Sequence, residues 1–449
     1  MYEIKEILKQ ELFLKKVLLK SLSMVNKLVD ESFIFIRKNY NKSMTVRNGK
    51  IEYIEFNNDI FFSIVVYSNF KKGSASSTDL NINSIKKTIF SAIEISKYTS
   101  SDKYSGLPDF DLANYKTVDL DLFHPSYINF KESFELAYSC EKYALDFSEK
   151  IVNTEGSCFS SQNSIIAFGN TKGILETYKS SQYFLSTCVI AQDKNSNKKE
   201  RDEYYSISRK LDCLSSPKYI GRKCSRKTLM KLNPVKIISK IYSIILTSDV
   251  SFSIFRSLSK AISGYEVYKN STFLRNSLNK LIFPNWLSIY EDPHIKRGIG
   301  SLPFDNEGTL TLPRFIVKDG VLKTWLLDSY SSRKLNLKNT GHSGGIYNWK
   351  LIQKYNISFH SLLKKMNTGL VITDFMGDGI NIVNGDYSRG ASGYFIKNGI
   401  FKYAVSEITL SGNLFEIYKN ISAISNDYDI RQNIQCGSIL ISNMIVSGV

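Results

Sequence analysis

Few residues of this chain have the types and spacing that metal chemistry requires. The 449 residues include only four histidines, which are His124, His294, His342 and His360. No two of them stand three or four positions apart, so no helix can present two imidazoles on one face to a zinc ion. The six cysteines contain no C-x-x-C pair, which leaves the usual structural zinc site without its ligands. We therefore expect this chain to bind no metal.

Nucleophilic catalysis has no clear sequence signal either. No G-x-S-x-G elbow precedes a predicted helix, and nothing marks one serine above the others. A Ser-His-Asp triad stays an open alternative, because its members need not be neighbours in sequence. His342 is the best single candidate for a binding role, since it stands in the glycine-flanked loop 340–345 and functional side chains concentrate on loops. The alternative is a histidine that only bonds the backbone of its own loop.

A glycine-rich region near the C-terminus gathers polar side chains. Its glycines favour tight turns and close backbone approach. The acidic residues there are Asp374, Asp378, Asp386 and Glu407. A carboxylate pair could perform acid–base work, but we favour carboxylates that accept backbone N–H bonds in turns. Arg389 follows Asp386 closely, which suggests an internal ion pair or a fork for a carboxylate, and we take both residues as binding candidates.

The composition is that of an ordinary soluble globular protein, with 43% hydrophobic and 22% charged residues. The net charge of +17 either serves a polyanion partner or reflects a general preference for lysine. Basic residues are spread along the whole chain, and their densest patch, 218–231, is interrupted by other residue types. We therefore expect no sequence-specific nucleic acid as a partner.

Targeting signals are missing from the sequence. No run of 18 apolar residues is present, so we expect no membrane span. The N-terminus alternates Lys, Glu and Leu and lacks the apolar core of a signal peptide. A chain of this length needs no disulfides for stability, so free thiols and a cytoplasmic location are expected.

Hydrophobic periodicity predicts helices and an antiparallel sheet in the first half. A helical pattern covers residues 3–30, and further helices are predicted at 84–98, with Asn83 as N-cap, and at 133–151. Strand-like runs occur at 33–36, 45–47, 50–56, 60–67, 165–168, 173–178 and 183–191. Asn48-Gly49 is a strong hairpin signal. Residues 193–201 are polar and are predicted to form a loop or hairpin tip.

The second half is predicted to be rich in strands. A helix at 226–232 is stopped by Pro234, and Asp249 is expected to cap the next helix. Hairpin turns are predicted at Asp319-Gly320 and Asn398-Gly399. The fold class is thus α+β, with an N-terminal antiparallel sheet and helices in residues 1–228 and a β-rich C-terminal domain in residues 229–449.

Several long motifs carry a family resemblance. They include VRNGKIEYIEFN at 46–57, KGSASSTDL at 72–80, YKNSTFL at 268–274, SLPFDNEG at 301–308, GDYSRGASG at 385–393 and EITLSGN at 407–413. In this order they resemble the TldD/PmbA family, and within it the PmbA (TldE) branch. The match runs from about Met44 to the end of the chain, and the first twenty residues show none.

The resemblance implies a cytoplasmic, heterodimeric zinc metallopeptidase that degrades or processes unfolded or leader peptides. In that family a TldD-like partner holds the zinc on a helix with the motif His-Glu-x-x-x-His, whose Glu can act on zinc-bound water. The corresponding segment here, within 244–262, contains no His and no Glu. Cys436 falls near the family's cysteine ligand, without an imidazole beside it in sequence. The resemblance therefore implies a metal-free subunit, inactive alone, with no catalytic residue of its own.

A second class of function stays open. The family has also been linked to inhibition of DNA gyrase, which implies a stand-alone regulatory or binding protein that modulates a nucleic-acid enzyme. Only the net charge of +17 supports this alternative. The presence of a relative with His-Glu-x-x-x-His in the same genome would favour the peptidase subunit instead.

Overall fold

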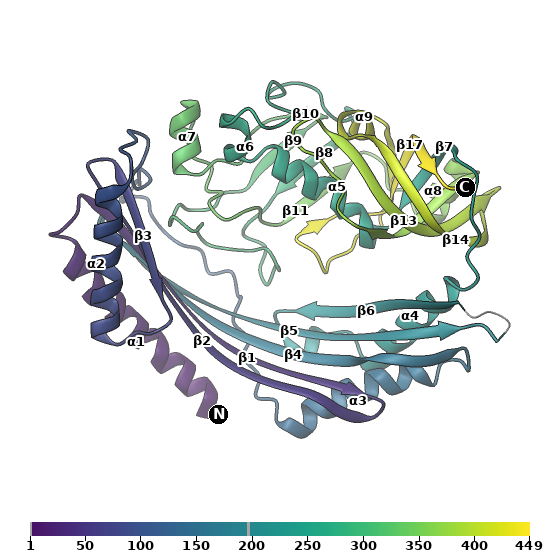
Figure 1. The fold of residues 1–449 in the computed structure, drawn as a ribbon, viewed down its shortest axis with the longest axis horizontal. Helices are drawn as coiled ribbons and strands as arrows, with labels where there is room; N and C mark the ends of the chain where they lie inside the picture. The colour runs from purple at the N-terminus through teal and green to yellow at the C-terminus, as the bar shows by residue number, and fades with distance from the viewer. Residues whose placement is uncertain (1, 195–197) are drawn as a thin grey trace.

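The first half of the chain forms one large antiparallel sheet. The structure, a computed structural model, describes residues 2–194 and 198–449, with side chains from Glu6 onward. Strand order is β3-β2-β1-β4-β5-β6. The strands are β1 (Glu31–Arg47), β2 (Lys50–Ser68), β3 (Lys71–Ser77), β4 (Ile151–Asn170), β5 (Leu175–Gln192) and β6 (Lys199–Ser208). The sheet curves around the second half of the molecule (Figure 1).

Four helices cover the convex face of this sheet. They are α1 (Tyr2–Val25), α2 (Ile82–Tyr98), α3 (Phe130–Leu145) and α4 (Pro217–Met230). Alternation along β1 explains the arrangement, because Ile34 and Ile36 point to one face and pack with Leu14 and Leu18 of α1. The opposite, concave face is turned toward the C-terminal half (Figure 1). None of the described helices is long and apolar enough to cross a membrane.

The C-terminal half contains two further sheets. One has the order β14-β13-β12-β7-β17-β15, and β14 also pairs with β17, so this sheet closes on itself. Its strands are β7 (Lys240–Leu246), β12 (Gly369–Met376), β13 (Asp386–Lys397), β14 (Ile400–Asn413), β15 (Ile421–Ile424) and β17 (Ile439–Ser447). The other sheet contains β8 (Leu287–Glu291), β9 (Arg314–Lys318), β10 (Val321–Leu322), β11 (Trp349–Gln353) and β16 (Ile434–Gln435).

Helices of this half pack against the two sheets. They are α5 (Ser248–Ala261), α6 (Gly264–Tyr268), α7 (Ser329–Leu335), α8 (Phe359–Met366) and α9 (Leu414–Lys419). The apolar side of α5 enters a large cluster in which Phe255 stacks near Phe283, and Phe283 near Tyr418. The predicted α+β class with a β-rich C-terminal domain is confirmed. The predicted boundary after residue 228 falls in the last turn of α4.

The three predicted hairpin turns are confirmed. Asn48 and Gly49 join β1 to β2 with φ of 51° and 72°. The Asp319-Gly320 and Asn398-Gly399 turns likewise have positive φ at both residues. Asn, Asp and Gly adopt this left-handed region at low cost, which is why these pairs signal hairpins reliably.

Several predicted element boundaries are wrong. Asn81, not Asn83, caps α2, because its side chain accepts the N–H of Ser84. The helix predicted at 133–151 begins at Phe130 behind an Asn129 capping box and ends at Leu145. The strand runs predicted at 165–168, 173–178 and 183–191 belong to the two long strands β4 and β5. Of the predicted tip 193–201, residues 195–197 lie outside the described part, and β6 begins at Lys199.

The helix predicted at 226–232 is only the end of α4. The helix α4 begins at Pro217 behind the N-cap Ser216. Gly221 in its interior is unfavourable for a helix, which is why the sequence pattern did not predict its full length. A Cβ at Gly221 would lie 2.5 Å from the carbonyl oxygen of Cys140, so this glycine lets α4 pack closely on α3. In α5 the N-cap position belongs to Thr247, and Asp249 lies in the first turn, so the predicted cap is wrong.

Candidate functional site

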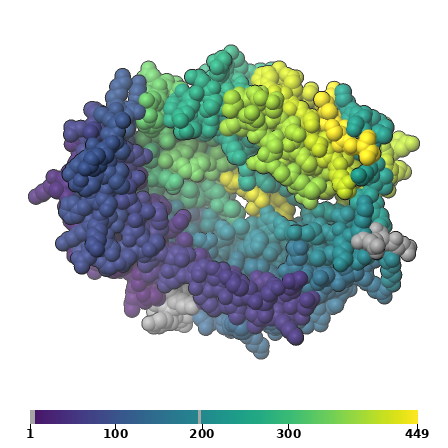
Figure 2. All heavy atoms as spheres, viewed as in Figure 1, coloured from purple at the N-terminus to yellow at the C-terminus, as the bar shows by residue number. Residues whose placement is uncertain are grey.

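A cleft of about 860 Å³ lies between the two halves of the chain. Its N-terminal wall comes from β6 and α4, and its C-terminal wall from the start of α5, β12, β13 and the loop 427–431. The lining mixes tyrosines and phenylalanines with charged groups of both signs. A hollow between the two halves is visible in Figure 2. A cleft of this volume falls within the usual range of ligand-binding pockets.

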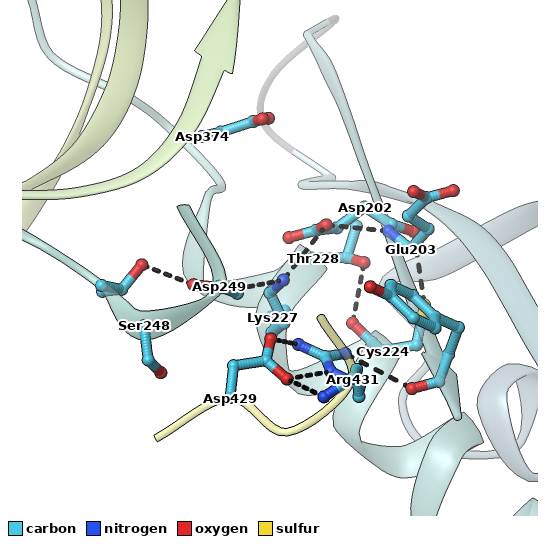
Figure 3. Close-up of polar contacts among 12 residues, drawn as sticks. Asp202, Glu203, Cys224, Lys227, Thr228, Ser248, Asp249, Asp374, Asp429 and Arg431 are labelled. Atoms are coloured by element: carbon cyan, nitrogen blue, oxygen red, sulfur yellow. Dashed lines mark hydrogen bonds and ion pairs between the residues drawn. The ribbon is translucent and has the colours of Figure 1, made fainter. Parts of the chain in front are cut away.

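An ion-pair network crosses the cleft (Figure 3). Lys227 in the last turn of α4 and Lys231 at its C-cap reach toward carboxylates of three other elements. The Lys227 Nζ lies 3.6 Å from the Asp202 Oδ1 of β6 and 3.1 Å from the Asp249 Oδ2 of α5. The Lys231 Nζ lies 3.0 Å from Asp202 and 3.2 Å from Asp374 of β12. The network therefore ties α4 and β6 to the C-terminal half.

The charges of this network hold one another in the ionised form. Burial raises the pKa of Asp249, but Lys227 and the Thr247 hydroxyl outweigh burial and hold that pKa below its usual value. Burial lowers the pKa of Lys227, but the carboxylates of Asp249 and Asp202 outweigh it and raise that pKa. Asp249 is thus an ionised carboxylate whose charge is balanced by the Lys227 ammonium.

The loop 427–431 is fixed against β6 by Arg431. Its guanidinium binds Asp429 through two nitrogens, at 2.9 and 2.6 Å. It also lies 4.6 Å from the ring centre of Tyr204 and 4.5 Å from that of Tyr205. A bidentate pair stacked on aromatic rings holds a loop far better than a lone lysine. This wall of the cleft is therefore preformed.

Cys436 lies beside the start of α5. The Ser251 Oγ of that helix donates to the carbonyl of Gly437 at 2.9 Å, and the Ser438 Oγ accepts the N–H of Ser248 at 3.1 Å. A Cβ at Gly437 would lie 1.8 Å from the Ser425 carbonyl oxygen, so only glycine permits this approach. Cys436 is fully buried, and burial raises the pKa of its thiol well above the usual range. A neutral thiol here packs as a small apolar side chain.

The side chains around the start of α5 do not fit a zinc site. Ser248 and Ser251 offer neutral hydroxyls, and the Asp249 carboxylate is engaged by Lys227. Zinc in proteins takes thiolate, imidazole or free carboxylate ligands. Across residues 6–194 and 198–449, no group of three or more His, Cys, Asp or Glu side chains is arranged to hold a metal ion.

His342 belongs to a separate, sealed cluster. Its Nε2 lies 2.8 Å from the Glu291 Oε2, and its Nδ1 lies 2.8 Å from the Thr340 hydroxyl. The other oxygen of Glu291 accepts the indole N–H of Trp349 at 2.8 Å and the backbone N–H of Tyr347 at 3.1 Å. The side chains of His342 and Glu291 are 1% and 0% exposed. This geometry gives the His342 ring a structural partner and buries it almost completely.

Asp305, near this cluster, is a buried carboxyl with a perturbed pKa. Burial, together with the Glu307 carboxylate, raises its pKa to about 7, although three backbone N–H groups oppose the shift. In the unfolded chain it titrates near pH 3.9, about the ordinary value for aspartate. Between about pH 4 and 7 the folded protein therefore keeps a proton that the unfolded chain has lost, so stability falls as pH rises through this window.

Asp305→Asn should remove this contribution, because the amide does not titrate. We expect the free energy of unfolding of the wild type, minus that of the variant, to decrease from about pH 4.5 to 7 and then level off. Urea denaturation at a series of pH values measures both free energies. A difference that stays constant with pH would show that Asp305 is already ionised in the folded protein at the acid end.

The other two predicted binding residues lie on β13 and do not pair. Asp386 and Arg389 are three positions apart on a strand, so their side chains point to opposite faces. Asp386 accepts the side-chain amide of Asn384, whereas Arg389 donates to the Gly377 carbonyl and lies 4.2 Å from the ring centre of Phe375. The predicted ion pair is therefore wrong. In the described part of the chain, no hydrogen bond or ion pair joins any two of His342, Asp386, Arg389 and Cys436.

Of the network residues, only Asp374, as one of four acidic residues, and Asp249, as a helix cap, were named from the sequence. Lys223, Lys227 and Lys231 stand at helical spacing in the patch 218–231, which could have marked one face of a helix. Their acidic partners come from three distant segments, and no local pattern connects those segments.

Family comparisons cover nearly the whole chain. Three family models match, described as domain 1, the central domain and the C-terminal domain of the PmbA/TldA metallopeptidases, at residues 33–96, 123–232 and 239–448. The chain is 46% identical to a protein named metalloprotease PmbA homolog from Buchnera aphidicola of Acyrthosiphon pisum, over 99% of both chains. It is 43% identical to metalloprotease PmbA of Escherichia coli O157:H7, over 99% of this chain and 98% of that one.

More distant proteins share the fold. A metalloprotease TldD homolog of the same Buchnera is 22% identical, over 89% of this chain and 86% of that one. A Bacteroides thetaiotaomicron crystal structure, named as a candidate modulator of DNA gyrase, has a TM-score of 0.90 at 24% identity and covers 97% of this chain and 99% of that one. TldE of Thermococcus kodakarensis has a TM-score of 0.82 at 18% identity and covers 96% and 100%.

Proposed function

The chain belongs to the PmbA/TldD family of metallopeptidases, and we propose that it is the metal-free, PmbA/TldE-type subunit of a heterodimeric zinc peptidase. A TldD-like partner of the same fold supplies the zinc and the catalytic water. The assembled pair acts in the cytoplasm on unfolded or leader peptides. In this chain, the cleft between the two halves binds part of the extended peptide.

One observation carries the proposal, namely the ion pair between Lys227 and Asp249 at the start of α5. Asp249 is the only acidic residue of this helix. If it stands for the Glu of His-Glu-x-x-x-His, the first histidine position is Ser248, whose hydroxyl is a poor zinc ligand. The Lys227 ammonium, 3.1 Å from Asp249, would also repel a divalent cation. The Lys227 ammonium therefore takes the position beside the carboxylate that a metal cation would otherwise take.

The net charge of +17 gives little support to a regulator of a nucleic-acid enzyme. In the densest basic patch, Lys227 and Lys231 are engaged by the carboxylates of Asp202, Asp249 and Asp374. Phosphate binding requires cations that face outward together. We therefore keep the peptidase subunit as the single proposal.

Metal content tests the proposal directly. The chain purified alone should hold no stoichiometric zinc, whereas the complex with a His-Glu-x-x-x-His relative should hold about one zinc per pair, as a single catalytic site requires. Elemental analysis after desalting measures both values, and the relative purified alone is the matched control. About one zinc per chain in this protein alone would contradict a metal-free subunit.

A further inference from the structure

The outer edge of β2 is open over residues 50–61. β3 pairs with β2 only from Phe62 to Ser68. Within residues 2–194 and 198–449, no other strand pairs with the rest of that edge. The backbone N–H and C=O groups that point outward there are a template for another strand.

The side chains of this open edge are unusually apolar for a free surface. None of residues 50–61 is buried. The exposed large apolar side chains are Ile51, Tyr53, Ile54, Phe56 and Phe61, and Phe56 is 65% exposed. The segment contains no proline, which is one of the usual devices that protect an edge from pairing. Four charged residues interrupt these apolar side chains, and the apolar ones remain available to another strand.

A hollow beside the edge suits the side chains of an added strand. Its volume is about 350 Å³, and it lies on the helix-covered side of the sheet, between β2 and the start of α3. Ile54 and Phe56 line it from the strand, and Tyr127 and Phe130, 58% and 51% exposed, line it from the other side. Strand addition combines backbone hydrogen bonds with pockets for alternate side chains, and both are present here. The β1–β2 hairpin lies on the lower surface of the molecule in Figure 2.

We propose that residues 50–61 dock against the equivalent edge strand of the partner subunit, so that the two N-terminal sheets join into one across the dimer. The inference rests on the proposed function, which requires a partner of the same fold. A TldD homolog is 22% identical over 89% of this chain, so a TldD-like partner corresponds to most of this fold. Pairing of equivalent edges about a two-fold axis is the simplest closed arrangement of two similar subunits.

Charge favours the partner over a second copy of this chain. Residues 50–61 contain three carboxylates, Glu52, Glu55 and Asp59, and one ammonium, Lys50. An antiparallel pair of two copies centred between Glu55 and Phe56 sets Glu52 opposite Asp59. A pair centred on Glu55 sets that residue against its own copy. Like charges directly opposite are destabilising, so these two registers disfavour a second copy, and the excess of carboxylates fits a partner edge with neutral or basic residues.

The test is a double variant, Ile54→Asn with Phe56→Asn, which removes the apolar contacts without changing the charge. We expect the dissociation constant for the TldD-like relative to rise about thirtyfold or more, as for loss of central interface residues. Tyr355→Asn is the matched control, because Tyr355 is also 65% exposed but lies in the loop before α8. Sedimentation velocity measures the binding, and circular dichroism checks that all variants fold.

Each outcome decides one question. If the wild type and Tyr355→Asn bind the relative and the double variant binds more weakly, the open edge is the docking surface. If the double variant binds as tightly as the wild type, the docking surface is elsewhere and the proposed function stands. If the wild type does not bind the relative, the proposed function itself fails. If the wild type forms a homodimer that the double variant loses, the occupant is a second copy. As a second readout, amide exchange of residues 50–61 should slow when the relative is added.

Discussion

Cleavage of an unstructured peptide should be undetectable with this chain alone and should appear when the chain is mixed with a His-Glu-x-x-x-His relative. The chemistry requires a metal-activated water, and the start of α5 offers two serine hydroxyls and a carboxylate already paired with Lys227. The cleft of about 860 Å³ can still hold part of the peptide. The measurement is peptide cleavage by each chain separately and by the mixture.

Two controls locate the catalytic site in that experiment. Replacing either metal histidine of the relative should abolish cleavage by the mixture, and a chelator should do the same, because both remove the metal. Cys436→Ser in this chain should change the rate only a few-fold, since its thiol is buried and neutral. Chelator-resistant cleavage by this chain alone would overturn the partner-subunit proposal and revive a serine or carboxylate mechanism.

Local signals in the sequence predict much of the fold. The Asn48-Gly49, Asp319-Gly320 and Asn398-Gly399 pairs give the hairpins, because left-handed φ values are set by a few residue types. Helix ends are less certain. Asn81 and Asn83 are equally good caps by composition, and only the position of the Ser84 N–H decides between them. The long strands β4 and β5 were predicted only in part because polar residues at 160–164 and 179–182 interrupt their apolar runs.

The candidate site was harder to predict than the fold. Lys227, Asp202 and Asp249 come from α4, β6 and α5, and only the folded chain brings them within ion-pair distance. Asp386 and Arg389 illustrate the opposite error. They are close in sequence, but strand alternation sends their side chains to opposite faces. On helices, residues three or four positions apart lie on the same face, so closeness in sequence predicts side-chain contact. On strands, residues an odd number of positions apart point to opposite faces, so the same inference fails.

His342→Ala should destabilise the folded chain by about 1–3 kcal/mol, the range for leaving a buried polar group without its hydrogen-bond partner. The substitution leaves the Glu291 carboxylate fully buried with one oxygen unpaired, because Trp349 and Tyr347 donate only to the other oxygen. His360→Ala is the matched control, since His360 is exposed on α8, and surface substitutions usually change stability by less than about 0.5 kcal/mol. Urea denaturation measures each free energy of unfolding.

A double-mutant cycle separates a structural His342 from a functional one. If the imidazole serves to hydrogen-bond and orient Glu291, removing both side chains should cost clearly less than the sum of the two single losses, because no unpaired carboxyl group remains in the double variant. The folded fraction of His342→Ala should then still support cleavage when it is paired with the relative. If the ring instead takes part in the reaction, stability should change little and cleavage should be lost. The sealed position of the ring, at 1% exposure, favours the first result.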